Sequence, residues 1–139
     1  MSSLKPFARI DGMEVFLVPL SYLLPHEHVK RCRAVEIRRN IEESGVFKRP
    51  IVVDRETGTI LDGHHRFTAA KIVGLTRIPA FLVRYASAEI EVVGWKDPVT
   101  KRDVLEAALS GKLMPPKTSR HLLPFEQERI DLSLDEVII

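Results

Sequence analysis

The chain has 139 residues, of which 45% are hydrophobic, and its 21 Lys and Arg against 19 Asp and Glu give a net charge of +2. This balance is typical of one globular domain, here residues 1–139, which can fold without disulfides or a structural metal. The sequence shows no signal-type apolar start and no run near the ~18 apolar residues that span a bilayer, which predicts a cytoplasmic protein without membrane contact. The small net charge argues against nucleic acid as a partner, because duplex binding needs clustered positive charge.

The first half of the chain predicts two strand regions separated by a helix. A β-branched and aromatic run predicts a strand at 15–20, and apolar residues at helical spacing before Gly45 predict a helix at 26–44. Two short apolar runs joined by a Glu-Thr-Gly turn predict a hairpin of strands at 50–54 and 59–61.

The second half completes one α+β domain. Thr100 and Asp103 have the spacing of a capping box and predict a helix start. No internal repeat or low-complexity segment interrupts the pattern. The predicted elements are a helix at 64–73, strands at 78–83 and 88–93, a helix at 101–110, a polar proline-broken loop at 113–121, and a short strand or packing segment at 130–139.

The densest group of chemically active residues lies where the hairpin meets the next helix. Asp62 is positioned to cap that helix, and Gly63 lets a ligand approach the backbone closely. A helix N-terminus offers unpaired N–H groups and a positive dipole end. Arg66 adds a planar donor fork suited to phosphate oxygens. His64, His65 and Arg66 are three groups expected to carry positive character beside this end, so the corner predicts an anionic, phosphate-bearing ligand.

Two other interpretations of this corner stay open. The first is a plain tight turn with surface histidines, in which Arg66 pairs with a neighbouring acid. The second is a zinc site, which fits less well because adjacent histidines point to different sides and no cysteine or third histidine lies at metal-ligand spacing.

These residues resemble a known superfamily. The core pattern is similar to the nucleotide-binding core of ParB and sulfiredoxin proteins, and its Asp-Gly-His-His-Arg form resembles the free serine kinases. The resemblance covers roughly residues 15–125. It implies a small mixed sheet with flanking helices, and transfer of a phosphoryl group from ADP or ATP to free L-serine with Mg²⁺, giving O-phosphoserine. The matched residues are 50–54, 60–66, 69–70, 74 and 78–79 for the core, and 24–27, 95, 101–102 and 115–121 for the kinase branch.

Two related groups fit the sequence less well. Sulfiredoxins carry a reactive cysteine in a Gly-Cys-His-Arg motif, where this chain has His64, and the lone Cys32 falls on the apolar side of the predicted first helix. ParB proteins carry an arginine-rich motif and helical DNA-reading domains after this core, which we do not expect here.

The resemblance also implies roles for individual residues. Glu27 is the predicted base for the serine hydroxyl, although a first-turn glutamate is also favoured by the helix dipole alone, by ~0.3–1 kcal/mol. Asp62 is the second catalytic carboxylate, with metal binding, assistance to the base and capping left open. Trp95 could equally pack in the core, and the loop could be simply solvated. Predicted substrate-binding residues are Trp95, Lys117, Thr118, Ser119, Arg120 and His121, with Lys48 and Arg102 as further basic candidates.

Two other functions remain possible on this sequence. A nucleotide-binding regulatory module would use the phosphate corner without turnover, and would need neither Glu27 nor the 118–121 loop. An enzyme of the same fold could also use another hydroxyl or amine acceptor. The choice between ADP and ATP, the metal ligands and the oligomeric state are not predicted.

Overall fold

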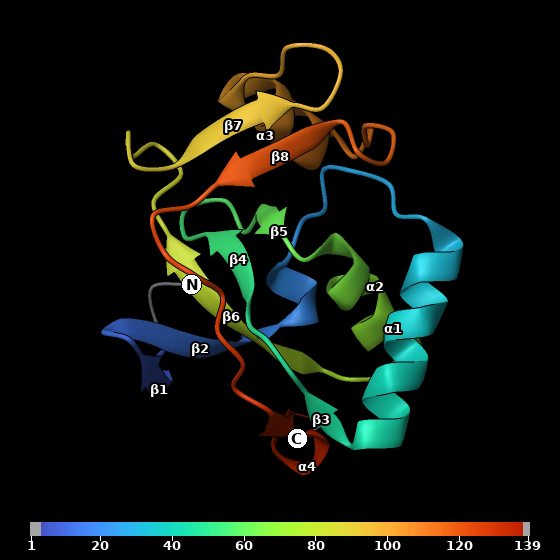
Figure 1. Cartoon of the computed structure of the whole chain (residues 1–139). Helices are drawn as coiled ribbons and strands as arrows, with labels where there is room; N and C mark the ends of the chain where they lie inside the picture. The colour runs from blue at the N-terminus through green and yellow to red at the C-terminus, as the bar shows by residue number, and fades with distance from the viewer. Residues whose placement is uncertain (1–3, 138–139) are drawn as a thin grey trace.

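The computed structural model describes residues 4–137 and is built around a mixed five-stranded sheet (Figure 1). The sheet order is β1-β2-β6-β4-β5, in which only β4 and β6 are parallel neighbours. The α+β class and the mixed sheet predicted from the sequence are therefore confirmed. The strands are β1 Pro6–Ile10, β2 Met13–Pro19, β4 Ile51–Asp54, β5 Ile60–Asp62 and β6 Arg77–Val83.

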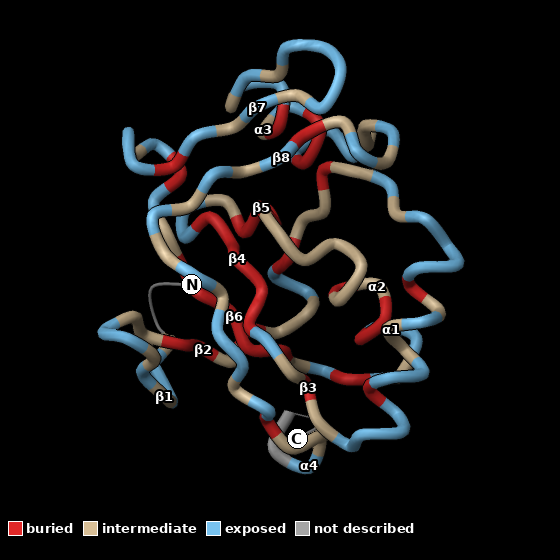
Figure 2. Tube along the Cα trace, in the orientation of Figure 1, coloured by how far each residue is buried: buried red, intermediate tan, exposed pale blue. Residues whose placement is uncertain are grey.

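Helices α1 and α2 lie side by side and cover one face of the sheet (Figure 1). The other face is covered by α3 and by the separate ribbon of β7 and β8. Central strands are therefore buried on both sides, as Figure 2 shows for β4. The remaining elements are a 3-10 turn Leu20–Tyr22, α1 Arg31–Ser44, β3 Val46–Phe47, α2 His64–Val73, β7 Glu91–Gly94, α3 Lys101–Ser110, β8 Ser119–Leu122, β9 Leu132–Ser133 and α4 Leu134–Val137.

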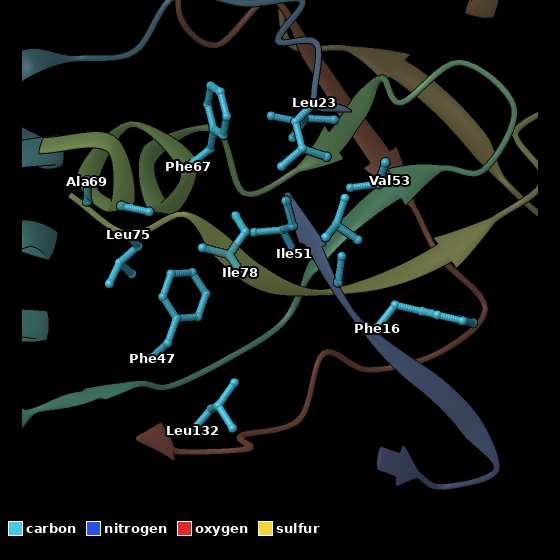
Figure 3. Packing of buried hydrophobic residues seen from close by; sticks show 14 of the residues in the cluster. Phe16, Leu23, Phe47, Ile51, Val53, Phe67, Ala69, Leu75, Ile78 and Leu132 are labelled. Atoms are coloured by element: carbon cyan, nitrogen blue, oxygen red, sulfur yellow. The ribbon is translucent and has the colours of Figure 1, made fainter. Parts of the chain in front are cut away.

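The larger core lies between the sheet and the α1–α2 pair. Phe67 of α2 belongs to the same buried cluster as Ile51 and Ile78 of the sheet (Figure 3). Phe47 and Leu132, from the paired short strands β3 and β9, close the same core from below in that view. Burial of such side chains stabilises each by ~1.5–3 kcal/mol, so this core fixes the position of the α2 N-terminus.

Several local predictions agree with the structure. The helices predicted at 64–73 and 101–110 have the same bounds, and the capping box of Thr100 and Asp103 is formed. The tail forms β9 and α4, consistent with the predicted short strand or packing segment. Its predicted last residues, Ile138 and Ile139, lie outside the described residues.

The first helix begins later than predicted. The sequence suggested 26–44, but α1 spans Arg31–Ser44, because the preceding residues bond through their backbone to the β4–β5 turn and to the segment after α3. Cys32 is exposed, so its predicted position on the apolar side is wrong. The helix buries Ala34 and Ile41 instead.

The strand predictions need corrections, and the short strand β3 was not predicted at all. Part of the predicted 113–121 loop is strand β8, which pairs antiparallel with β7. The strand predicted at 88–93 begins only at Glu91, because Ile90 closes a turn onto Ser87. Strand β1 was missed because its residues are mostly exposed and lack a strong apolar pattern.

Within residues 4–137, no helix combines the length and apolar character needed to cross a lipid bilayer.

Candidate functional site

A cleft of about 950 Å³ collects the predicted site residues. Its walls come from α1, the α2 N-terminus, β8 and the loop before β8, which lie near one another in Figure 1. Of the predicted residues, Thr118 is not part of the lining, and its backbone contacts Glu27 instead. The predicted residues that line the cleft are Glu27, Asp62, Gly63, His64, His65, Arg66, Trp95, Lys117, Ser119, Arg120 and His121. Of the two further basic candidates, Lys48 lines the cleft, whereas Arg102 pairs with Glu106 on the exposed side of α3.

The α2 N-terminus is shaped by Gly63, which has a φ of 110°. A Cβ at this position would lie 2.4 Å from Cγ2 of Ile51, so only glycine fits. The first helical hydrogen bond runs from the Phe67 amide to the Gly63 carbonyl. The backbone amides of His64, His65 and Arg66 precede this bond, so the hydrogen bonds of the helix do not use them. Amides in this position bind anions at helix N-termini.

Asp62 does not cap this helix, so that prediction is wrong. Gly63 is the N-cap residue and no side chain bonds to the cap. The Asp62 carboxylate instead accepts a hydrogen bond from the side-chain amide of Gln127 and lies 3.8 Å from the Arg66 guanidinium. Arg66 in turn donates to the Pro50 carbonyl at 2.9 Å and to the Gln127 side chain at 2.8 Å. Both terminal nitrogens of the Arg66 guanidinium therefore donate hydrogen bonds to the protein itself, within a polar network that includes Gln127 and Asp62.

The two histidines of the corner are neutral rather than cationic. Burial lowers the pKa of His64 well below 6.5 and also lowers that of His65. The ring of His64 accepts a hydrogen bond from the His26 amide at 3.1 Å, and that of His65 accepts one from the Lys30 amide at 3.2 Å. The positive character expected of these rings is therefore wrong. Positive charge comes instead from Arg33, Lys48, Arg49, Lys117, Arg120 and Arg129, which also line the cleft.

Glu27 lies in an extended segment rather than in the first turn of a helix. Glu27 lies four residues before α1 begins and forms an isolated parallel β-bridge with Met114. The helix-dipole explanation for this glutamate is therefore wrong. Its carboxylate accepts hydrogen bonds from the amides of Thr118 and Ser119, the latter at 3.2 Å. Burial raises the pKa of Glu27, and these two amides partly oppose the shift. A positioned, partly desolvated carboxylate in a cleft has the properties of a general base.

Three histidine rings meet beside Glu27, which sequence spacing did not predict. The His26 ring centroid lies 4.4 Å from that of His64 and 5.7 Å from that of His121. His121 is held by the Tyr85 hydroxyl at 2.8 Å and by the Leu61 carbonyl. His26 lies within residues 24–27, which resemble the free serine kinases, but its sequence neighbours give no sign that the ring is buried.

The cluster contains residue types that bind metals, but ring nitrogens of both histidines are already used in hydrogen bonds. Candidate ligand atoms of His26, Glu27 and His64 lie within 4.8 Å of one another. Both ring nitrogens of His26 and the Nε2 atom of His64 already hold hydrogen bonds. The cluster therefore fits a hydrogen-bond network better than a zinc site.

Trp95 is on the surface of the cleft. It is 57% exposed, which removes the interpretation that it packs in the core. The Arg120 guanidinium lies 5.6 Å from the centre of its ring, a cation–π arrangement that forms one wall of the cleft. Ser119 is buried, so the neighbouring strand start is also not a solvated loop.

The buried histidines predict a loss of stability in mild acid. Burial lowers the pKa of His26 and of His121 to about 4, from an ordinary 6.5. Below about pH 6.5 the unfolded chain binds protons that the folded chain does not, so the free energy of unfolding falls until about pH 4. Each histidine adds a slope of up to ~1.4 kcal/mol per pH unit.

Urea unfolding across this pH window measures the effect. His121→Asn should show a shallower fall than the wild type. A free energy of unfolding that is constant across the window would contradict the neutral, buried state of these rings.

Comparison with known proteins supports the resemblance drawn from the sequence. Ninety residues, 62% of this chain, are 31% identical to the ATP-dependent L-serine kinase of Staphylothermus marinus. Over 105 residues, 73% of the chain, it is 27% identical to the ADP-dependent L-serine kinase of Thermococcus kodakarensis. A 46-residue segment, 33% of the chain, is 48% identical to a ParB-like protein of Sulfolobus acidocaldarius. The matches span only 36%, 42% and 23% of these relatives.

The fold matches that of a solved free serine kinase in complex with AMP, with a TM-score of 0.83 and 18% identity. The match covers 95% of each chain. No protein-family model matches the sequence. The predicted similarity to the ParB/sulfiredoxin group, and within it to the free serine kinases, is thus confirmed for sequence and fold.

Proposed function

We propose that this protein transfers the terminal phosphoryl group of ADP or ATP to free L-serine, giving O-phosphoserine, in the cytoplasm. The observation that carries the proposal is Glu27, a partly desolvated carboxylate held by two backbone amides in a cleft that also contains the α2 N-terminus. Similarity to L-serine kinases that use ATP or ADP supports the choice of donor and acceptor. The fold would act as one domain whose partners are a nucleotide and serine, without nucleic acid or membrane.

Each part of the cleft has a task in this reaction. The first amides of α2 would hold the phosphates of the nucleotide. Lys117 and Arg120, which line the same cleft, would bind the serine carboxylate. Glu27 would take the proton of the serine hydroxyl as its oxygen bonds to the terminal phosphorus. The bond from that phosphorus to the nucleotide's bridging oxygen breaks, and the charge leaves with the shortened nucleotide.

The corner is also chemically suited to Mg²⁺. Asp62 is a carboxylate beside the predicted phosphate position, and its side chain is 49% exposed. Magnesium prefers oxygen ligands and keeps several waters, so Asp62 and the nucleotide phosphates would hold it. The ion would supply charge neutralisation on the phosphates.

The direct test is product formation. Purified protein is incubated with Mg²⁺ and L-serine plus ADP or, separately, ATP, and O-phosphoserine is measured together with AMP or the new ADP. We expect phosphoserine with at least one donor. L-threonine, L-homoserine and ethanolamine as alternative acceptors test the specificity for serine. If the nucleotide binds but no acceptor is phosphorylated with either donor, the proposal is wrong.

The sole tryptophan should report substrate binding. Because Trp95 lies in the cleft wall beside Arg120, we expect its fluorescence to change when nucleotide and L-serine are added. Trp95→Phe should remove the signal. It should also raise KM for serine more than it lowers kcat if the ring only holds the substrate. A signal that serine does not alter would remove Trp95 from the serine pocket.

The second candidate function is a nucleotide-binding regulatory module. It is favoured by the 46-residue similarity to a ParB-like protein. Such a module needs only the nucleotide-binding residues at the α2 N-terminus. Glu27 variants would then bind nucleotide normally, and neither they nor the wild type would show turnover.

A further inference from the structure

The loop of residues 114–119 holds Glu27 at two points. At the start of the loop, the Met114 amide donates to the His26 carbonyl at 2.9 Å, and the Met114 carbonyl accepts from the His28 amide at 2.8 Å. At the end of the loop, two successive backbone amides donate to the Glu27 carboxylate. The loop therefore fixes both the backbone and the side chain of this glutamate.

The two amides share one oxygen of the carboxylate. Thr118 and Ser119 both donate to Oε1 of Glu27, the latter at 3.2 Å, and neither amide bonds to Oε2. An amide that donates to a carboxylate favours its charged form. Oε1 is thus held by the loop, and Oε2 is the oxygen available to take a proton.

The residue before these amides, Lys117, has an unusual backbone. Its φ is 58°, in the left-handed region that side chains other than those of asparagine, aspartate and histidine rarely adopt. Within residues 4–137, Asp11, Lys117 and Asp131 are the residues other than glycine with a positive φ. Of these three, Lys117 alone lines the cleft. A left-handed lysine in a cleft calls for a functional explanation.

The turn at Lys117 brings the two amides to the same side of the chain. The Thr118 hydroxyl closes the turn by donating to the Pro115 carbonyl at 2.6 Å, and the rings of Pro115 and Pro116 fix φ on the approach. The Thr118 carbonyl is fixed in turn by the Trp95 amide at 3.2 Å. Successive amides in such a turn form a concave anion site. Here the anion is the protein's own carboxylate.

We propose that Lys117 is a positioning residue through its backbone, whose left-handed conformation aims the next two amides at Oε1 of Glu27 and so sets the direction of Oε2. The inference rests on the proposed function, in which Glu27 is the base. The proton leaves the acceptor hydroxyl for Oε2, and the electron pair that it leaves on the hydroxyl oxygen bonds to phosphorus. Oε1 stays on the loop throughout. The Lys117 side chain keeps its proposed contact with the serine carboxylate, so the residue serves the site twice.

The test separates the backbone of Lys117 from its side chain. Lys117→Gly and Lys117→Val both remove the ammonium group, but glycine adopts a φ of 58° freely and β-branched valine does not. The Glu27 titration midpoint is followed by ¹³C NMR of glutamate side-chain carboxyls in the ligand-free protein, and Glu27→Gln identifies the resonance. Losing the amides disfavours the carboxylate, so we expect the midpoint in Lys117→Val to lie about one pH unit above that in Lys117→Gly.

A matched control comes from the same stretch of chain. Lys112→Val makes the same exchange outside the cleft lining, at a residue whose φ is not positive, and should leave the wild-type midpoint unchanged. The other charged or titratable groups around Glu27 are the same in every Lys117 variant. They come from its own segment, α1, β5, α2 and β8, and are His26, Arg33, Asp62, His64, Arg120 and His121.

Two results would overturn the proposal. Equal midpoints in Lys117→Gly and Lys117→Val would mean that the amides reach Glu27 whatever conformation residue 117 prefers. A lower midpoint in Lys117→Val would mean that the amides do not support the carboxylate. If Lys117→Val does not fold, Lys117→Ala provides the same comparison with less strain and the same expected direction. Lys117→Asn, which tolerates the left-handed region, should match Lys117→Gly.

Turnover gives an independent readout. Both Lys117→Gly and Lys117→Val should raise KM for serine, because both lose the proposed contact with its carboxylate. Well above both midpoints, Lys117→Val should also lower kcat to about one-tenth of the Lys117→Gly value, since Oε2 is then misdirected. The NMR comparison needs no substrate. A failure to form phosphoserine would therefore overturn the proposed function while leaving the Lys117 measurement interpretable.

Discussion

Glu27→Gln is expected to lower phosphoserine formation by a factor of at least ~10², the usual contribution of a positioned base. The substitution conserves size, and the remaining side-chain oxygen can still accept the amides of Thr118 and Ser119. The cleft wall should therefore keep its shape while the proton acceptor is lost. Initial rates at saturating serine and nucleotide measure the effect, and nucleotide affinity should stay close to that of the wild type.

A matched control lies in the same cleft. Glu36 is a glutamate of α1 that lines the cleft and pairs with Arg33 on its exposed side. Glu36→Gln removes the same charge without touching the proposed base, so we expect a change in rate well below that of Glu27→Gln. Equal losses in the two variants would show that negative charge in the cleft matters and that Glu27 is not the base.

Gly63→Ala is expected to destabilise the protein by about 2–6 kcal/mol and to abolish nucleotide binding. One part of this cost is backbone strain, because the φ of 110° is outside the ordinary range of alanine, at ~1–3 kcal/mol. A second part is the clash with the side chain of Ile51, only 2.4 Å from the new Cβ, at ~1–3 kcal/mol for an overpacked core. Urea unfolding and calorimetric titration with ADP measure the two effects.

The other end of α2 separates strain from clash. Gly74 also has a positive φ, 95°, but a Cβ there would meet no atom within 4 Å. Gly74→Ala should therefore cost about 1–2 kcal/mol, from the left-handed backbone alone, and should leave nucleotide affinity unchanged. If Gly63→Ala costs no more than Gly74→Ala, the corner tolerates a side chain and its close packing does not shape the site.

The parts of the fold that sequence predicted well are those with local signals. Helix α2 begins after Gly63 and ends at Gly74, and both glycines adopt the positive φ that favours this residue. The capping box of Thr100 likewise marks a helix start within four residues. Such patterns are complete inside one short segment, so no knowledge of the rest of the chain is required.

The parts that sequence missed depend on distant partners. Glu27 was wrongly assigned to a helix. Its extended conformation depends on a β-bridge to Met114, which is far along the chain and leaves no local signal. The charge of His64 was misjudged because its burial comes from packing against His26 and His121. Asp62 was assigned to a cap because its real partner, Gln127, is 65 positions away.

The position of Gln127 has a consequence for how the site is made. The segment from 123 to 131 runs from β8 to β9, which pairs with β3 (Figure 1). The Gln127 side chain in this segment bonds to both Asp62 and Arg66. During synthesis, the hairpin and α2 leave the ribosome long before this segment does. The core around α2 can collapse early, yet its polar corner gains its last partners only when the segment docks, and such long loops close slowly. Newly made chains would therefore bring the sheet and α2 together before Leu132 completes the core and Gln127 completes the polar corner.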